Sequence, residues 1–108
     1  MFLGLFTRKD INQGVAEWES TKGAVLLDVR TKEEYADSHI KGSVNVPLNE
    51  LETIRRVVPD KATPIFVYCL SGGRSASAAA YLKRSGYSHV YDIGGINSYR
   101  GETVSCSI

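Results

Sequence analysis

One stretch near the middle of the chain places a strand, a glycine-containing loop and a helix in immediate succession. Residues 65–68 form an apolar run that predicts a short buried strand, and residues 75–82 are rich in alanine, which favours a helix. A strand that leads directly into a helix directs backbone N–H groups and the positive end of the helix dipole into one small concavity. The rest of the fold must hold this strand end beneath a helix N-terminus.

Segments of the same two kinds alternate along the chain. Apolar runs predict strands at residues 24–29, 43–46, 65–68 and 89–93. Apolar spacing, N-capping residues and helix-favouring composition predict helices at residues 11–18, 32–37, 48–58 and 75–84. This alternation is typical of an α/β domain with a mostly parallel sheet and helices on both faces. In such domains the functional site lies at the carboxyl ends of the strands, where Cys69 stands.

Length and charge limit the remaining possibilities. With 108 residues, the chain is predicted to form one domain over residues 1–108. A net charge of +1 argues against nucleic acid or an anionic membrane as a partner. Residues 1–6 are apolar but too few for a signal peptide or a membrane span, so we expect an edge strand or a hydrophobic cover there, with a partner-docking patch as the alternative.

The cysteine count points to a reducing compartment. The chain has two cysteines, Cys69 and Cys106, without the paired spacing of a metal site or a thioredoxin motif. We therefore expect no metal and a cytoplasmic location. Cys106, near the C-terminus, has two interpretations: a bystander, or a resolving thiol that attacks an oxidised or persulfidated Cys69.

The loop after the central strand predicts a reactive thiol. Backbone N–H groups of the loop can converge on one point and form a nest for an anion, to which Arg74 adds a fixed cation. Such surroundings favour the thiolate of Cys69 and make it a nucleophile near neutral pH. The alternative is a core cysteine that merely ends a strand, which would need no such loop. The predicted binding loop comprises Leu70, Ser71, Gly72, Gly73, Arg74 and Ser75.

The order of the short motifs resembles the single-domain rhodaneses. The motifs that carry the resemblance are residues 26–30 (LLDVR), 34–35 (EY), 39–43 (HIKGS), 45–47 (NVP), 69–75 (CLSGGRS) and 94–96 (GGI). The resemblance implies a three-layer rhodanese-like domain with a five-stranded, mostly parallel sheet. It also implies a sulfurtransferase without a cofactor, in which Cys69 takes the outer sulfur of a donor such as thiosulfate as a persulfide. A small thiol or a protein acceptor then removes that sulfur.

Two other functions compete with this one. Relatives with cysteine-dependent phosphatase or arsenate reductase activity have a loop one residue longer, and the spacing from Cys69 to Arg74 fits the shorter, sulfur-binding loop. A rhodanese-fold regulatory or persulfide-carrier module is the other alternative. In its regulatory form it would have lost the cysteine that this chain retains.

Other polar residues are expected to support the site. Asp28 and Arg30 flank Val29 at a strand end, and we interpret them as a structural ion pair in which Arg30 contacts Glu34 or a loop carbonyl. His39 could serve as a general base, but its place in a turn favours a hydrogen-bonded structural role. Tyr99 occupies the position where the family often has tryptophan.

Overall fold

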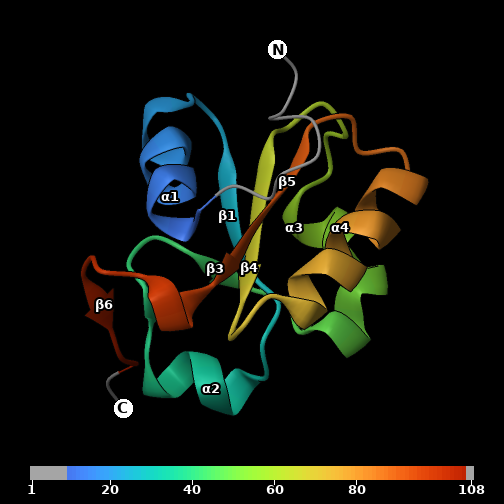
Figure 1. Ribbon diagram of the computed structural model, residues 1–108. Coiled ribbons are helices and arrows are strands. Elements are labelled where there is room, and N and C mark those ends of the chain that lie inside the picture. Colours follow the sequence, from blue (N-terminus) through green and yellow to red (C-terminus); the bar gives the residue numbers. More distant parts are fainter. Residues whose placement is uncertain (1–9, 107–108) are drawn as a thin grey trace.

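The protein is built around a parallel sheet of four strands. A computed structural model describes residues 10–106 of the chain. The strands are hydrogen-bonded in the order β3-β1-β4-β5 and all pairs are parallel (Figure 1). Their bounds are Val25–Asp28 (β1), Val44–Asn45 (β3), Ile65–Cys69 (β4) and Val90–Gly95 (β5). β1 and β4 are central, as their continuous apolar sequences predict.

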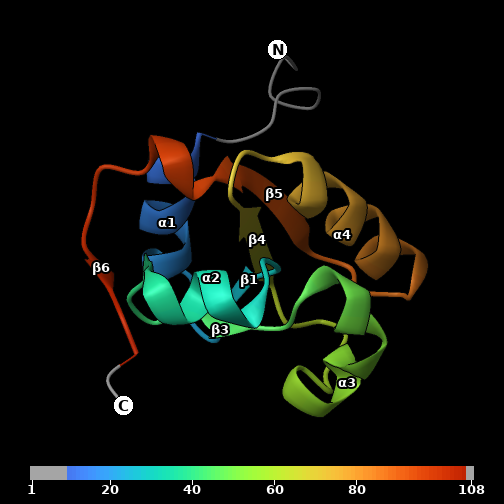
Figure 2. The ribbon, with the colours of Figure 1, turned by 90° about the horizontal axis from the view of Figure 1, so that it is seen from below.

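Helices cover both faces of this sheet. Helix α1 (Ile11–Ser20) lies on one face, and α4 (Gly73–Arg84) lies on the other with the short helix α3 (Ile54–Val57) (Figure 2). Helix α2 (Lys32–Asp37) crosses the end of the sheet at which β4 terminates (Figures 1 and 2). This confirms the predicted α/β class with helices on both faces. None of the helices between residues 10 and 106 is long and apolar enough to cross a membrane.

The two faces of β4 contribute to two separate hydrophobic clusters. Ile65, Val67 and Cys69 belong to the cluster beneath α3 and α4, whereas Phe66 and Tyr68 belong to the cluster beneath α1. All five residues of the strand are buried. The strict alternation of side chains along a strand thus fixes the face on which Cys69 lies. The thiol is directed to the α4 side of the sheet.

The number of strands differs from the expected five. In the described part of the chain the main sheet has four strands, and two further strands form a separate antiparallel pair. That pair joins β2 (His39–Ile40), which falls within a predicted turn, to β6 (Thr103–Val104), where no element was expected. Neither segment lies in an apolar stretch like residues 43–46, which predicted the equally short β3. The edge strand considered for residues 1–6 lies outside the described residues.

The segment predicted as one helix over residues 48–58 is divided. Residues Leu48–Thr53 form a 3-10 helix, and only Ile54–Val57 are α-helical. Glu50 has φ near −119°, outside the helical range, and this interrupts the regular hydrogen-bond ladder. The apolar spacing gave most of the buried side, because Leu51, Ile54 and Val58 lie in the core, whereas Val57 is exposed.

Candidate active site

Cys69 ends β4, and its thiol lies beside the first turn of α4. The chain turns sharply between them at Gly72, whose φ of 116° lies in the region that favours glycine. Helix α4 then begins at Gly73. Cys69 is buried, with 1% of its surface exposed. The predicted strand, loop and helix are therefore present in the predicted order.

Backbone groups of the loop surround the sulfur atom. The Gly72 N–H donates to Cys69 Sγ at 3.0 Å, and Ser75 Oγ lies 3.5 Å from the same sulfur. Burial opposes ionisation of the thiol, but hydrogen bonds that the Ser75 hydroxyl and the backbone N–H groups of Ser75, Gly72 and Arg74 can donate to the thiolate outweigh it and lower the pKa of Cys69. The loop thus favours the thiolate. Three of the six backbone N–H groups in the predicted binding loop contribute to this effect.

Arg74 is held by Glu34, a partner that the sequence did not predict for it. Its Nη1 and Nη2 atoms donate to the two carboxylate oxygens of Glu34 in α2, at 2.7 and 3.0 Å. The pKa of Arg74 is raised first by this hydrogen-bonded pair and also by the negative charge of the Cys69 thiolate. Glu34 therefore fixes the cation near the loop. The sequence indicated Glu34 as part of the EY motif, as an acid in the first turn of α2 and as a possible partner of Arg30, but not as the partner of Arg74.

Asp28 and Arg30 form a buried ion pair beneath the site. Arg30 donates to both carboxylate oxygens of Asp28, with the shortest contact at 2.7 Å, and also donates to the Ser38 carbonyl at 2.6 Å. Asn45 donates to the backbone carbonyls of both residues at 3.0 Å. The expected ion pair is present, and the further partner that accepts a hydrogen bond from Arg30 is the Ser38 carbonyl rather than Glu34. This network joins the end of β1 to the segment after α2.

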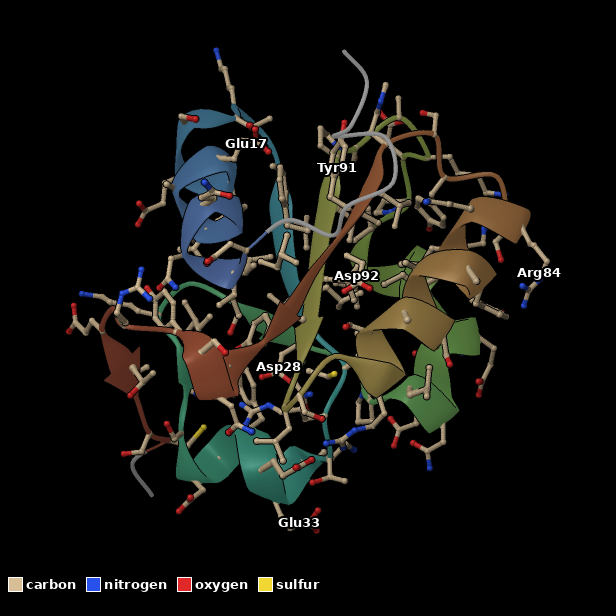
Figure 3. All side chains as sticks on the ribbon, viewed as in Figure 1. Glu17, Asp28, Glu33, Arg84, Tyr91 and Asp92 are labelled. Carbon is tan, nitrogen blue, oxygen red and sulfur yellow. The ribbon has the colours of Figure 1, made fainter. Side chains whose placement is uncertain are left out.

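A third polar contact, from β5, was not expected. Ser75 Oγ donates to Oδ1 of Asp92 at 2.7 Å, and the Gly94 N–H donates to the same oxygen at 3.1 Å. Figure 3 labels Asp92 between the sheet and α4, and Asp28 near the end of the sheet above α2. An acid in the otherwise apolar run of residues 90–93 was the only sign of Asp92 in the sequence.

The remaining candidates contact residues outside the cysteine loop. His39 is a hydrogen-bonded structural histidine: its Nδ1 lies 2.7 Å from the Tyr35 carbonyl and its ring stacks on that of Tyr35 at 3.7 Å. Cys106 is exposed, and its backbone N–H donates to the Ala36 carbonyl at 2.9 Å. It therefore lies against α2. Tyr99, at the position where the family often has tryptophan, packs against the hydrophobic cluster under α1.

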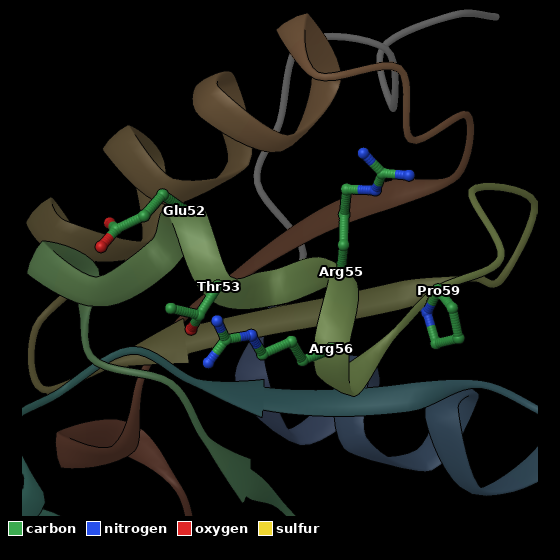
Figure 4. A pocket seen from close by; sticks show the side chains of 5 residues that line it. All are labelled: Glu52, Thr53, Arg55, Arg56 and Pro59. Carbon is green, nitrogen blue, oxygen red and sulfur yellow. The ribbon is translucent and has the colours of Figure 1, made fainter.

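Two hollows differ in their relation to the thiol. One of about 290 Å³ lies beside the loop, where its walls include Val29, Leu48 and Arg74. Another of about 540 Å³ lies at α3, away from Cys69, and includes Arg55 and Arg56 (Figure 4). The two guanidinium groups of that hollow point in different directions, so they do not converge on one ligand. The hollow beside the loop is the one that adjoins the candidate site.

Known proteins resemble the chain in both sequence and structure. "Thiosulfate sulfurtransferase PspE" of Escherichia coli (strain K12) is 42% identical over 71 residues, which are 65% of this chain and 68% of the relative. "Putative sulfur carrier protein YrkF" of Bacillus subtilis (strain 168) is 36% identical over 86 residues, which are 79% of this chain but 46% of the relative. A solved "rhodanese with anions from E. coli" superimposes with a TM-score of 0.71 at 37% identity, covering 76% of this chain and 98% of its own.

A family model agrees with these relatives. The model described as a rhodanese-like domain matches residues 10–102, a span that includes all four strands of the main sheet and the cysteine loop. The resemblance inferred from the short motifs is therefore confirmed. The chain belongs to the rhodanese-like domain family.

Proposed function

We propose that the chain is a thiosulfate sulfurtransferase that carries a sulfane sulfur on Cys69 as a persulfide. The observation that carries the proposal is the position of the Cys69 thiol at the start of α4, where hydrogen bonds lower its pKa despite burial. A thiolate at this place is the nucleophile that sulfur transfer needs. The name of the relative PspE, a thiosulfate sulfurtransferase, supports the choice of donor.

The reaction proceeds in two displacement steps. The Cys69 thiolate attacks the outer sulfur of thiosulfate; a new S–S bond forms, the bond between the two sulfurs of thiosulfate breaks, and its electron pair leaves with sulfite. An acceptor thiolate, or cyanide in an assay, then attacks the terminal sulfur and restores the Cys69 thiolate. Each step is a two-electron displacement at sulfur in which one bond forms and one breaks, so no separate oxidant or cofactor is required. Ping-pong kinetics are expected.

The loop supplies the electrostatic support for both steps. The amides of Gly72, Arg74 and Ser75 and the N-terminal end of α4 stabilise the negative charge on the thiolate and on the persulfide. The side chain of Arg74, fixed by Glu34, attracts an anionic donor. We assign the other loop residues, Leu70, Ser71 and Gly73, to the wall around the transferred sulfur. Asp28 and Arg30 have a supporting role through the buried network at the end of β1.

A persulfide carrier that passes its sulfur to a protein is the second candidate. The relative YrkF, a putative sulfur carrier protein, supports it. The chemistry at Cys69 is the same in both cases, and only the acceptor differs. The phosphatase or arsenate reductase alternative would require a roomier loop than the four residues between Cys69 and Arg74 provide. A cytoplasmic location stays a prediction from the cysteine usage.

Loading with thiosulfate tests the proposal directly. The protein is incubated with thiosulfate and its intact mass is measured, alongside Cys69→Ser and the matched control Cys106→Ser. We expect one added sulfur atom on the unmodified protein and on the Cys106→Ser variant, and none on the Cys69→Ser variant. Addition of cyanide should then release the sulfur as thiocyanate. Sulfur that persists on the Cys69→Ser variant, or efficient hydrolysis of para-nitrophenyl phosphate without sulfur loading, would contradict it.

A further inference from the structure

The hydroxyl of Ser75 lies between two groups that compete for its single proton. On one side, Oδ1 of Asp92 accepts a hydrogen bond from Ser75 Oγ at 2.7 Å. On the other side, Cys69 Sγ lies at 3.5 Å. The Gly72 carbonyl, at 3.1 Å, is a further and more distant acceptor. A serine hydroxyl has one proton to donate, so it cannot stabilise the carboxylate and a thiolate at the same time.

The contact with Asp92 is the shortest of the three and its acceptor is a carboxylate, so we infer that the hydroxyl proton is directed to Asp92 in the resting state. Ser75 Oγ then presents a lone pair to the sulfur and accepts a hydrogen bond from the Cys69 S–H. This arrangement suits the neutral thiol. A thiolate facing the same lone pair would be repelled, and it gains a partner only if the hydroxyl rotates away from the carboxylate and donates to sulfur.

The fold explains why these three residues meet. β4 and β5 are paired in parallel, with Val67 opposite Asp92, and Val67 and Cys69 both belong to the cluster beneath α4. Asp92 therefore lies on the face of the sheet that α4 covers, within hydrogen-bond distance of Ser75 in the first turn of that helix. Ser75, in that first turn, has 0% exposure and is enclosed between the two strands and the helix.

We propose that Asp92 is a positioning residue that sets the direction of the Ser75 hydroxyl and so governs how readily Cys69 ionises. When the thiol ionises, its proton leaves to solvent and the Ser75 O–H rotates from Oδ1 to Sγ. Asp92 competes with the sulfur for that donor and favours the resting thiol. The inference rests on Cys69 as the nucleophile of the proposed function.

Other charged groups near the site must be kept constant. They are Arg74 of α4 with its partner Glu34 of α2, and Asp28 at the end of β1 with its partner Arg30. None of them shares the Ser75 proton in the contacts described here. A change in thiol ionisation that depends on the Ser75 hydroxyl therefore separates Asp92 from these charges.

The test is the pH dependence of Cys69 alkylation by iodoacetamide, with Cys106→Ser as the common background so that one thiol reports. Asp92→Asn keeps the shape and an acceptor oxygen but binds the hydroxyl proton less strongly. We expect the midpoint of its pH–rate curve to fall, and the rate well below that midpoint to rise about threefold to tenfold, the factor that one ordinary hydrogen bond is worth. Ser75→Ala removes the donor, and its midpoint should rise.

The double variant decides whether Asp92 acts through Ser75. If it does, Asp92→Asn shifts the midpoint much less in the Ser75→Ala background than beside the native serine. An equal shift in both backgrounds would mean that Asp92 acts only as a charge through space, and this would overturn the proposal. So would an unchanged or higher midpoint in the single Asp92→Asn variant. Alkylation needs no sulfur donor, so these results are independent of whether thiosulfate loads the protein.

A measurement on the chain with native Asp92 and Ser75 covers the case in which Asp92→Asn does not fold. The ¹³C signal of the Asp92 carboxyl group is followed by NMR while Cys69 is titrated. We expect the signal to change at the midpoint of thiol ionisation, when the carboxylate loses its hydrogen bond from Ser75. A signal that stays constant through that titration would overturn the proposal.

Discussion

At the scale of single residues, Glu34 connects the start of one helix to the cysteine loop. One of its oxygens accepts a hydrogen bond from the Thr31 N–H at 2.9 Å, which completes the capping box of α2, and both bind Arg74. The hydrogen bond with Arg74 contributes most to a pKa of about 2 for this carboxyl. The ion pair is partly exposed, so solvent weakens its net contribution to stability.

Replacing Glu34 with glutamine should make this contribution measurable. Glutamine retains the bond to Thr31 but not the charge. Because the folded pKa of about 2 lies below the ordinary value of 4.5, the charge stabilises the fold fully above that ordinary value and loses its effect as pH falls toward 2. We expect Glu34→Gln to lower the free energy of unfolding by about 1 kcal/mol at neutral pH, with the difference shrinking through the acid range in urea titrations.

The neighbouring acid provides the control for this change. Glu33 lies in the same first turn of α2, and its replacement by glutamine removes an equal charge from the helix N-terminus. The variant Glu33→Gln should lose less stability than Glu34→Gln. A deficit for Glu34→Gln that stayed constant down to pH 2, or that matched the control, would show that the pair with Arg74 adds nothing.

At the scale of elements, β5 supports the cysteine loop through its backbone. The Asn97 N–H, just beyond the strand, donates to the Leu70 carbonyl at 3.1 Å. A Cβ atom added at Gly95 would lie 2.6 Å from Ser71 Cα and closer still to the Leu70 carbonyl oxygen. Both neighbours are backbone atoms, so they cannot turn aside as a flexible side chain would. The absence of a side chain at Gly95 allows the loop to lie directly on β5.

Gly95→Ala should therefore displace the loop. We expect a loss of about 1 to 3 kcal/mol in the free energy of unfolding, as for other overpacked sites, together with slower alkylation of Cys69. Gly73→Ala is the matched control in the same loop: a Cβ there meets nothing within 4 Å, and φ is not positive. Its stability should stay the same or rise by up to about 1 kcal/mol, since alanine favours the helix. Equal effects in the two variants, measured by urea unfolding, would contradict this account.

The elements themselves were largely predictable because each has a local cause. The continuous apolar run predicts β4, and Thr31 with Glu34 predicts the start of α2. The two-residue strands β2 and β6 were missed because their pairing joins segments far apart in the chain. Local sequence contains no information about such partners.

The contacts of the site divide in the same way. The loop from Cys69 to Ser75 is one continuous segment, and its hydrogen bonds to the sulfur follow from its sequence. The pairs that control its charge, Glu34 with Arg74 and Ser75 with Asp92, join residues 40 and 17 positions apart. The packing of α2, α4 and β5 around the end of the sheet determines which acid binds Arg74 and which binds Ser75. The sequence alone therefore left the partner of Arg30 open.

At the scale of the whole molecule, the sheet separates two hydrophobic clusters that differ in size. The larger lies beneath α3 and α4 and includes Cys69 at its edge, and the smaller lies beneath α1. In the smaller cluster α1 approaches the sheet closely, because Gly14 of the helix stands directly over Ile93 of β5. A Cβ atom at Gly14 would lie 2.6 Å from the Cβ of Ile93, and nearer still to its Cγ2.

This close approach predicts that even one methyl group added at Gly14 does not fit between α1 and the sheet. In an isolated helix, Gly14→Ala would stabilise by about 1 kcal/mol. In the folded protein Ile93 is fully buried and cannot move aside, so the helix must shift outward and withdraw Ile11 and Val15 from the cluster. We expect this overpacking to exceed the gain in propensity and to leave a net loss of about 1 to 2 kcal/mol in thermal or urea unfolding. The control is Gln13→Ala, at an exposed position of the same helix, which should leave the free energy of unfolding unchanged or raise it slightly. If Gly14→Ala were as stable as that control, α1 would be free to move relative to the sheet.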